Sequence, residues 1–212
     1  MNRWTWMLTS CAVAAVVGYV TLRPITGVAQ VRGSLDPQYV TGGDLVRPKD
    51  FHSWIFVGSN LGLGYDKEVA ANTVREAARA QLGEYHNIYL KPEDYAAYVR
   101  TGMFPDRTVL VMDVYASQQR DAKGVVTAGS YNGQWLGIEV AVKNKNRPDG
   151  SKTDWAYYDF TDRPGKGKNI PAVQKAEDDG SCYACHKAHA GYDNVWVQFY
   201  PLIRDVWHPA TP

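Results

Sequence analysis

The chain has 212 residues, a formal net charge of +1 at pH 7 and a hydrophobic content of 45%. This length and composition suit one globular domain with a sizeable core. The nearly balanced charge gives no electrostatic basis for binding nucleic acid or an acidic membrane surface, so we expect no nucleic-acid partner. Aromatic residues make up 12% of the chain, and such side chains pack cores and also line pockets for flat ligands.

Residues 1–29 have the pattern of an export segment. Arg3 gives a short basic start, residues 4–22 are nearly all apolar or small, and the small residues ending at Ala29 offer a cleavage site. An uncleaved anchor is the alternative, because the apolar run is about long enough to span a bilayer. Both forms place the rest of the chain in an exported, oxidising compartment, with membrane contact through this segment alone.

The remaining chain divides into an N-terminal arm, residues 30–47, and a main domain, residues 48–212. The arm is rich in Gly, Pro and Asp. In chain order, the main domain is predicted to contain a strand over 51–60, a helix over 66–82, a strand over 85–90, a helix over 92–100, and strands over 108–116, 130–145 and 155–160. Long antiparallel strands with a few short helices predict an α+β fold dominated by sheet.

The segment GSCYACHKAH contains Cys182, Cys185 and His186 in the pattern Cys-x-x-Cys-His. A disulfide across so short a loop adds little stability, and a zinc site would need a second pair of ligands. A thioredoxin-like dithiol would follow a buried strand, whereas this motif follows a polar loop. Two thiols on one helical turn can form thioethers to the vinyl groups of a haem, and the adjacent histidine can bind the iron from below. The motif therefore predicts one covalent haem c, with its iron, near the C-terminus.

Several segments occur in the order found in the cytochrome P-460 and cytochrome c′-beta family. They are WIFVGS, IYLKPEDYAAYVRTGMFPDRTVLV, GQWLGIEVAVKN, WAYYDF, the Cys-x-x-Cys-His motif and VWVQFYPLIR. The chain resembles this family from about Pro48 to Arg204. The resemblance implies a mainly antiparallel β fold that holds a haem between sheet and helix, often as a homodimer in the periplasm. It also implies that members differ in function, since some oxidise hydroxylamine or bind nitric oxide.

The chain departs from the hydroxylamine-oxidising relatives at Met112. Those relatives carry a lysine at the matching position, bonded to the porphyrin, so the characteristic cross-link is not expected here, and hydroxylamine oxidation is less favoured than electron transfer or gas binding. Strand alternation places Leu110, Met112 and Val114 on one face. Two interpretations of Met112 remain open. It fills the core beside the haem as a soft apolar side chain, or its thioether binds the iron opposite His186 and raises the reduction potential.

Glu139 is the candidate catalytic residue. In its predicted strand, alternation places Ile138 and Val140 on the apolar face and Glu139 on the other face, beside small residues. One interpretation is a solvated carboxylate on an exposed face. The other is a carboxylate beside the distal pocket, which accepts protons during oxidation of a small nitrogen compound. The resemblance supports the second interpretation, because the catalytic relatives carry a glutamate at the matching position.

Two functions from different classes follow. The first is an exported mono-haem c-type cytochrome that passes electrons to a redox partner protein. The second is a five-coordinate haem protein that binds or converts nitric oxide or hydroxylamine, and so acts as an oxidoreductase. The other histidines, His52, His86, His189 and His208, show no metal-ligand spacing, and His189 is expected at the surface.

Overall fold

The computed structural model describes residues 36–63, 83–119, 123–125, 128–162 and 170–206. The chain divides into two compact units, residues 1–33 and 34–212, and the described residues all belong to the second. The predicted export segment and the predicted helix over 66–82 lie outside the described residues. Within the described part of the chain, no helix is both long enough and apolar enough to cross a membrane.

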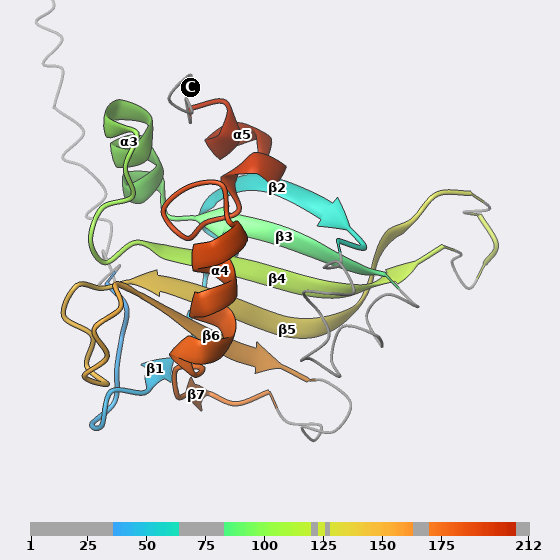
Figure 1. The fold of residues 1–212 in the computed structure, drawn as a ribbon. Helices are drawn as coiled ribbons and strands as arrows, with labels where there is room; N and C mark the ends of the chain where they lie inside the picture. The colour runs from blue at the N-terminus through green and yellow to red at the C-terminus, as the bar shows by residue number, and fades with distance from the viewer. Residues whose placement is uncertain (1–35, 64–82, 120–122, 126–127, 163–169, 207–212) are drawn as a thin grey trace, which may run out of the picture. The chain divides into compact units, whose positions relative to one another are not determined.

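A five-stranded antiparallel sheet with the order β2-β3-β4-β5-β6 forms the main layer (Figure 1). Each strand pairs with the next strand along the chain, so the sheet is a meander. The strands are β2 (Ile55–Leu61), β3 (Glu84–Leu90), β4 (Val109–Gln118), β5 (Tyr131–Lys143) and β6 (Trp155–Thr161). They are rich in β-branched and aromatic residues, which favour extended backbone. The predicted α+β class dominated by antiparallel sheet is confirmed.

A second, two-stranded sheet pairs β1 (Leu45–Val46) with β7 (Val173–Gln174). Its first strand comes from the region predicted as an arm, and Leu45 is only 1% exposed. The predicted strand over 51–60 begins later than expected. Residues Phe51–Ser53 form the 3-10 turn η1, in which the Ser53 hydroxyl and backbone N–H both donate to the Asp50 carbonyl.

Short helices complete the fold. Helix α3 (Pro92–Thr101) begins with a proline, as predicted for a helix over 92–100, and ends before Gly102, whose left-handed backbone terminates it. The chain after β7 carries η2 (Asp179–Tyr183), α4 (Ala184–His189), η3 (Val197–Phe199) and α5 (Pro201–Arg204). Residues 178–206, called the C-terminal segment below, cover one face of the sheet (Figure 1).

The close fit of the C-terminal segment on β2 depends on Gly58. A methyl group at this position would lie 3.1 Å from the Pro201 Cδ atom and 3.3 Å from the Tyr200 Cδ1 atom. These separations are tighter than ordinary van der Waals contact, so a larger side chain would push α5 away from the sheet.

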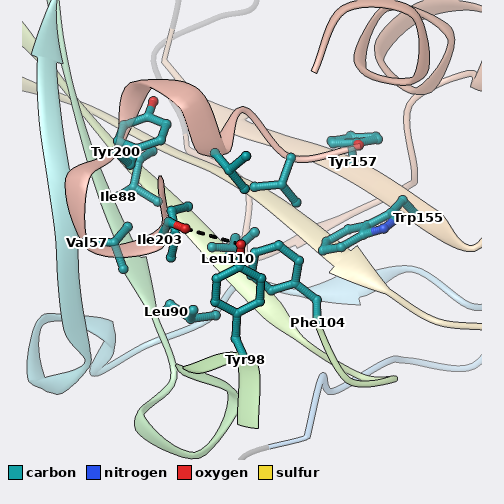
Figure 2. Close-up of a cluster of buried hydrophobic side chains, with 12 residues drawn as sticks. Val57, Ile88, Leu90, Tyr98, Phe104, Leu110, Trp155, Tyr157, Tyr200 and Ile203 are labelled. Carbon is teal, nitrogen blue, oxygen red and sulfur yellow. Dashed lines mark hydrogen bonds between the residues drawn. The ribbon is translucent and has the colours of Figure 1, made fainter. Parts of the chain in front are cut away.

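Two hydrophobic clusters occupy the two faces of the sheet. The first joins the sheet to α3 and the C-terminal segment (Figure 2). In it, the rings of Tyr98 and Phe104 stack with centroids 4.2 Å apart, and the Tyr98 hydroxyl donates to the Ile203 carbonyl at 3.2 Å. The second cluster lies on the opposite face and comprises Leu45, Phe51, Val109, Val111, Ile138, Val140, Val142, Ala156, Tyr158 and Phe160. The first cluster therefore attaches the C-terminal segment to the face of the sheet that it covers.

Candidate haem site

A cavity of about 240 Å³ lies between the sheet and the C-terminal segment. The sheet side of its lining includes His86, Ile88, Met112, Glu139, Tyr157 and Asp159. The other side includes Cys182, His186, Asn194, Trp196 and Tyr200. The cavity therefore brings Cys182 and His186 of the motif together with both strand residues singled out from the sequence, whereas Cys185 is not part of its lining.

The Cys-x-x-Cys-His motif lies on a continuous helical segment. The π-helical turn η2 carries Cys182, and α4 follows directly with Cys185 and His186. The Asp178 side chain begins this segment by accepting a hydrogen bond from the Gly180 N–H at 2.7 Å. The two thiols are not joined to each other in a disulfide. The placement of the two cysteines within one helical turn of each other fits a haem held by two thioethers.

The His186 imidazole is oriented as an iron ligand requires. Its Nδ1 atom donates to the Asn194 carbonyl at 2.8 Å, which leaves a lone pair on Nε2. The Trp196 indole N–H donates to that Nε2 atom at 3.2 Å, in keeping with the same tautomer. Burial lowers the pKa of His186 to about 4, so the ring is neutral at pH 7. A neutral imidazole suits a haem iron, which would take the place of the Trp196 N–H at the Nε2 lone pair.

The cavity wall formed by the sheet follows from strand register. Ile88, Met112, Glu139 and Asp159 are successive partners across β3, β4, β5 and β6. Directly opposed residues of antiparallel strands share a face, so these four side chains form one row. The alternation predicted for β4 and β5 is confirmed, because the neighbouring residues Val111, Ile138 and Val140 belong to the opposite cluster.

The structure places Met112 and Glu139 in this wall, both half-buried. Met112 therefore lines the same cavity as His186. Glu139 lies opposite Asp159 rather than on an exposed face, and Asp159 is only 5% exposed. The Asp159 carboxylate accepts a hydrogen bond from the Thr161 N–H at 2.9 Å. The wall thus combines one thioether with two carboxylates.

Sequence reasoning passed over several residues of the site. His86 is 8% exposed and lines the cavity, with Asn60 as its cross-strand partner. The Asn60 amide donates to the Tyr200 hydroxyl at 2.8 Å, and burial raises the pKa of Tyr200 to about 12. His86 and Ile88 are two positions apart in β3, so strand alternation predicts that they share a face. The sequence did not reveal which face of β3 the C-terminal segment would cover. His189 is exposed, as expected.

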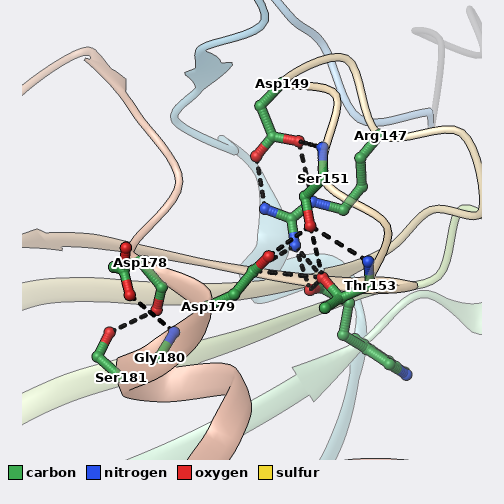
Figure 3. A network of polar contacts seen from close by, with 9 residues as sticks. Arg147, Asp149, Ser151, Thr153, Asp178, Asp179, Gly180 and Ser181 are labelled. Carbon is green, nitrogen blue, oxygen red and sulfur yellow. Dashed lines mark hydrogen bonds and ion pairs between the residues drawn. The ribbon is translucent and has the colours of Figure 1, made fainter.

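A buried arginine ties the start of the motif segment to the connection between β5 and β6 (Figure 3). The Arg147 side chain is 2% exposed, and its Nη1 atom donates to the Asp179 carboxylate at 2.7 Å and to the Trp155 carbonyl at 2.8 Å. The guanidinium also pairs with Asp149. Burial alone would raise the pKa of Asp179, but hydrogen bonds from Ser151 and Arg147 hold that pKa below its usual range.

A second buried cation acts after the motif. The Lys143 ammonium donates to the Asp193 carboxylate at 2.7 Å and to the Phe104 carbonyl at 3.1 Å. The Trp155 indole N–H donates to the other carboxylate oxygen of Asp193 at 3.1 Å. Asp193 precedes Asn194, whose carbonyl accepts from His186, so this pair fixes the neighbourhood of the candidate ligand.

The cavity beneath the Cys-x-x-Cys-His segment, together with the family match that follows, identifies the protein as a haem-binding cytochrome. The family model of cytochrome P460 matches residues 48–197, and the chain belongs to the cytochrome P460 family. A search of curated proteins finds no match to the chain. Within the described residues, no group of three or more His, Cys, Asp and Glu side chains could hold a metal ion. Membership in the family instead implies iron that is bound within a haem.

Proposed function

We propose that this protein is an exported mono-haem c-type cytochrome that acts in electron transfer. Cys182 and Cys185 bind the haem vinyl groups as thioethers, and His186 binds the iron. The observation that carries the proposal is the state of His186, which lines the same cavity as Cys182 and whose Nδ1 is held by the Asn194 carbonyl. Iron binding at Nε2 would replace the hydrogen bond from the Trp196 N–H. The haem supplies a one-electron iron couple.

The chain's own residues set how that couple behaves. Of the two methionines in the described residues, Met103 is 58% exposed and Met112 lines the cavity. Met112 is therefore the thioether available to the sixth iron position. A His/Met pair raises the reduction potential and closes that position to small ligands, which suits electron exchange with a partner protein.

Export to the periplasm belongs to the same proposal. It is supported by the basic start, apolar run and small residues of positions 1–29. An exported compartment also suits covalent attachment, because a thioether-bound haem cannot dissociate from the chain. The redox partner is a second protein whose docking brings its own centre close to the haem.

The carboxylates of the sheet wall support a second candidate function. If the sixth position is open, Glu139 and Asp159 line the cavity in which nitric oxide or hydroxylamine would bind. Glu139 would then accept protons removed from the nitrogen compound as it is oxidised. Met112 would pack beside the haem, in the place where the oxidising relatives carry their lysine.

Absorption spectra of the purified protein, oxidised and reduced, with and without carbon monoxide, test both functions. Electron transfer with Met112 ligation predicts a low-spin spectrum with a sulfur-to-iron charge-transfer band, unchanged by carbon monoxide. A high-spin spectrum that shifts with carbon monoxide supports the second function. Haem that dissociates on acid extraction contradicts the thioether assignment to Cys182 and Cys185 in either case.

A further inference from the structure

We propose that Tyr157 tunes the electron density on His186 by sharing its hydrogen-bond acceptor, a role that rests on the proposed function of His186 as iron ligand. The Asn194 carbonyl accepts from the His186 Nδ1 atom at 2.8 Å and from the Tyr157 hydroxyl at 3.0 Å. A carbonyl oxygen has two lone pairs, so both bonds can form together. Each donor then weakens the acceptor for the other.

Tyr157 is the donor in its bond to the carbonyl. It is 8% exposed, and a carbonyl oxygen can only accept, so the hydroxyl supplies the proton. Its ring also contacts the imidazole, with centroids 4.3 Å apart and an interplanar angle of 41°. The same residue therefore limits rotation of His186 and competes for the carbonyl that orients it.

The shared carbonyl is held in place by an unusual turn. Asp193 and Asn194 have φ angles of 48° and 58°, and the Tyr192 and Val195 backbones exchange hydrogen bonds around them. Two successive left-handed residues between paired positions are the signature of a type I′ turn, and Asp and Asn tolerate this conformation best among residues with side chains. The Lys143 and Trp155 bonds to Asp193 fix the turn from outside.

The consequence for an iron ligand follows from second-shell chemistry. A strong hydrogen bond from Nδ1 makes the imidazole a better electron donor, which stabilises ferric iron and lowers the reduction potential. The Tyr157 hydroxyl draws part of the electron density from the same carbonyl, so it weakens the bond from Nδ1. The tyrosine therefore raises the potential, in the same direction as a thioether opposite His186.

The test is Tyr157→Phe in the haem-loaded protein, because phenylalanine keeps the ring contact and removes only the hydroxyl. We expect the reduction potential to fall by the equivalent of about threefold in the equilibrium constant, or about 28 mV at about 59 mV per tenfold change. The exchangeable Nδ1 proton of His186, measured by NMR in the reduced, low-spin protein, should move downfield as its hydrogen bond strengthens. Tyr158→Phe is the matched control, since this neighbouring residue also borders the cavity but packs in the cluster on the opposite face.

The outcomes separate this inference from the proposed function. An unchanged or raised potential in Tyr157→Phe, with the haem still attached, overturns the tuning role and leaves His186 as the ligand. An equal fall in Tyr158→Phe also overturns it, because the change would then reflect general loosening of β6. Wild-type protein without covalently bound haem overturns the proposed function and the tuning role together.

Discussion

The motif segment is held at its two ends by two buried cations from neighbouring parts of the chain. Arg147 binds Asp179 immediately before the cysteines, and Lys143 binds Asp193 a few residues after His186. The arginine side chain is 2% exposed and reaches two carboxylates and a backbone carbonyl. The lysine side chain is 12% exposed and reaches one carboxylate and one carbonyl.

The arginine and the lysine differ because they stabilise different parts of the motif segment. The planar guanidinium can satisfy several acceptors at once, which suits a junction between the β5–β6 connection and the helical start of the motif. The lysine instead fixes the turn whose carbonyl orients His186. The arginine end therefore contributes mainly to stability, whereas the lysine end contributes to the properties of the ligand.

Removing the arginine should have the largest effect on stability. Arg147→Met leaves Asp149 and Asp179 without their buried cation, and breaking such pairs costs about 3 kcal/mol in the free energy of unfolding. Chemical denaturation measures this loss. Arg107→Met is the control, because Arg107 also pairs with a distant aspartate, Asp36, but is 51% exposed and should lose less than about 1 kcal/mol. Equal losses in the free energy of unfolding in the two variants would contradict a special stabilising role for the ion pairs of Arg147.

Removing the lysine should cost less stability but should alter His186. Lys143→Met leaves the Trp155 N–H on Asp193, so we expect a loss of about 2 kcal/mol. The freed turn should also shift the His186 Nδ1 proton resonance and the reduction potential, which Arg147→Met should leave nearly unchanged. Lys145→Met, an exposed lysine on the same hairpin, serves as control. A potential shift in Arg147→Met as large as in Lys143→Met would remove the distinction between the two ends.

Lowering the pH should reduce the stability contributed by the Arg147 ion pairs, by less than the two substitutions do. Burial opposes ionisation of Asp149 and Asp179, but the hydrogen bonds that include those from Arg147 leave the pKa of each carboxyl below its ordinary 3.8. As pH falls through this region, the unfolded chain takes up protons before the folded chain does, so the free energy of unfolding decreases. Denaturation curves between pH 5 and 3 should show a shallower decrease in Arg147→Met than in Arg107→Met. Parallel decreases would contradict the expected pKa shifts.

Much of the fold and part of the site could be predicted from the sequence. Alternating residues placed β3 to β6 within a few positions, and they put Met112 and Glu139 on the face opposite Val111 and Ile138. The cysteine motif could also be recognised, because its three residues lie within five positions. Each of these features depends on residues that are close together in the sequence, so local patterns were enough to predict them.

The contacts that hold the site could not be predicted in the same way. Arg147 and Asp179 lie 32 positions apart, and charge patterning along the chain does not say which aspartate meets which cation. Tyr157 and His186 meet only because the C-terminal segment covers this face of the sheet. The Asp193-Asn194 pair was a local signal, since both residues favour left-handed turns, but its importance depends on the distant Lys143.

The smallest change in stability is expected at Met112, which is uncharged and lines the cavity. Met112→Leu nearly conserves volume and should cost less than about 1.5 kcal/mol. Its spectroscopic effect should nevertheless be large, because leucine has no sulfur to bind iron. We expect loss of the sulfur-to-iron band, new binding of carbon monoxide and a lower reduction potential. Met103→Leu, at a 58% exposed position, should change none of these. If Met112→Leu leaves the wild-type spectrum and potential intact, Met112 is a packing residue, and the carboxylates beside it become the more important part of the wall.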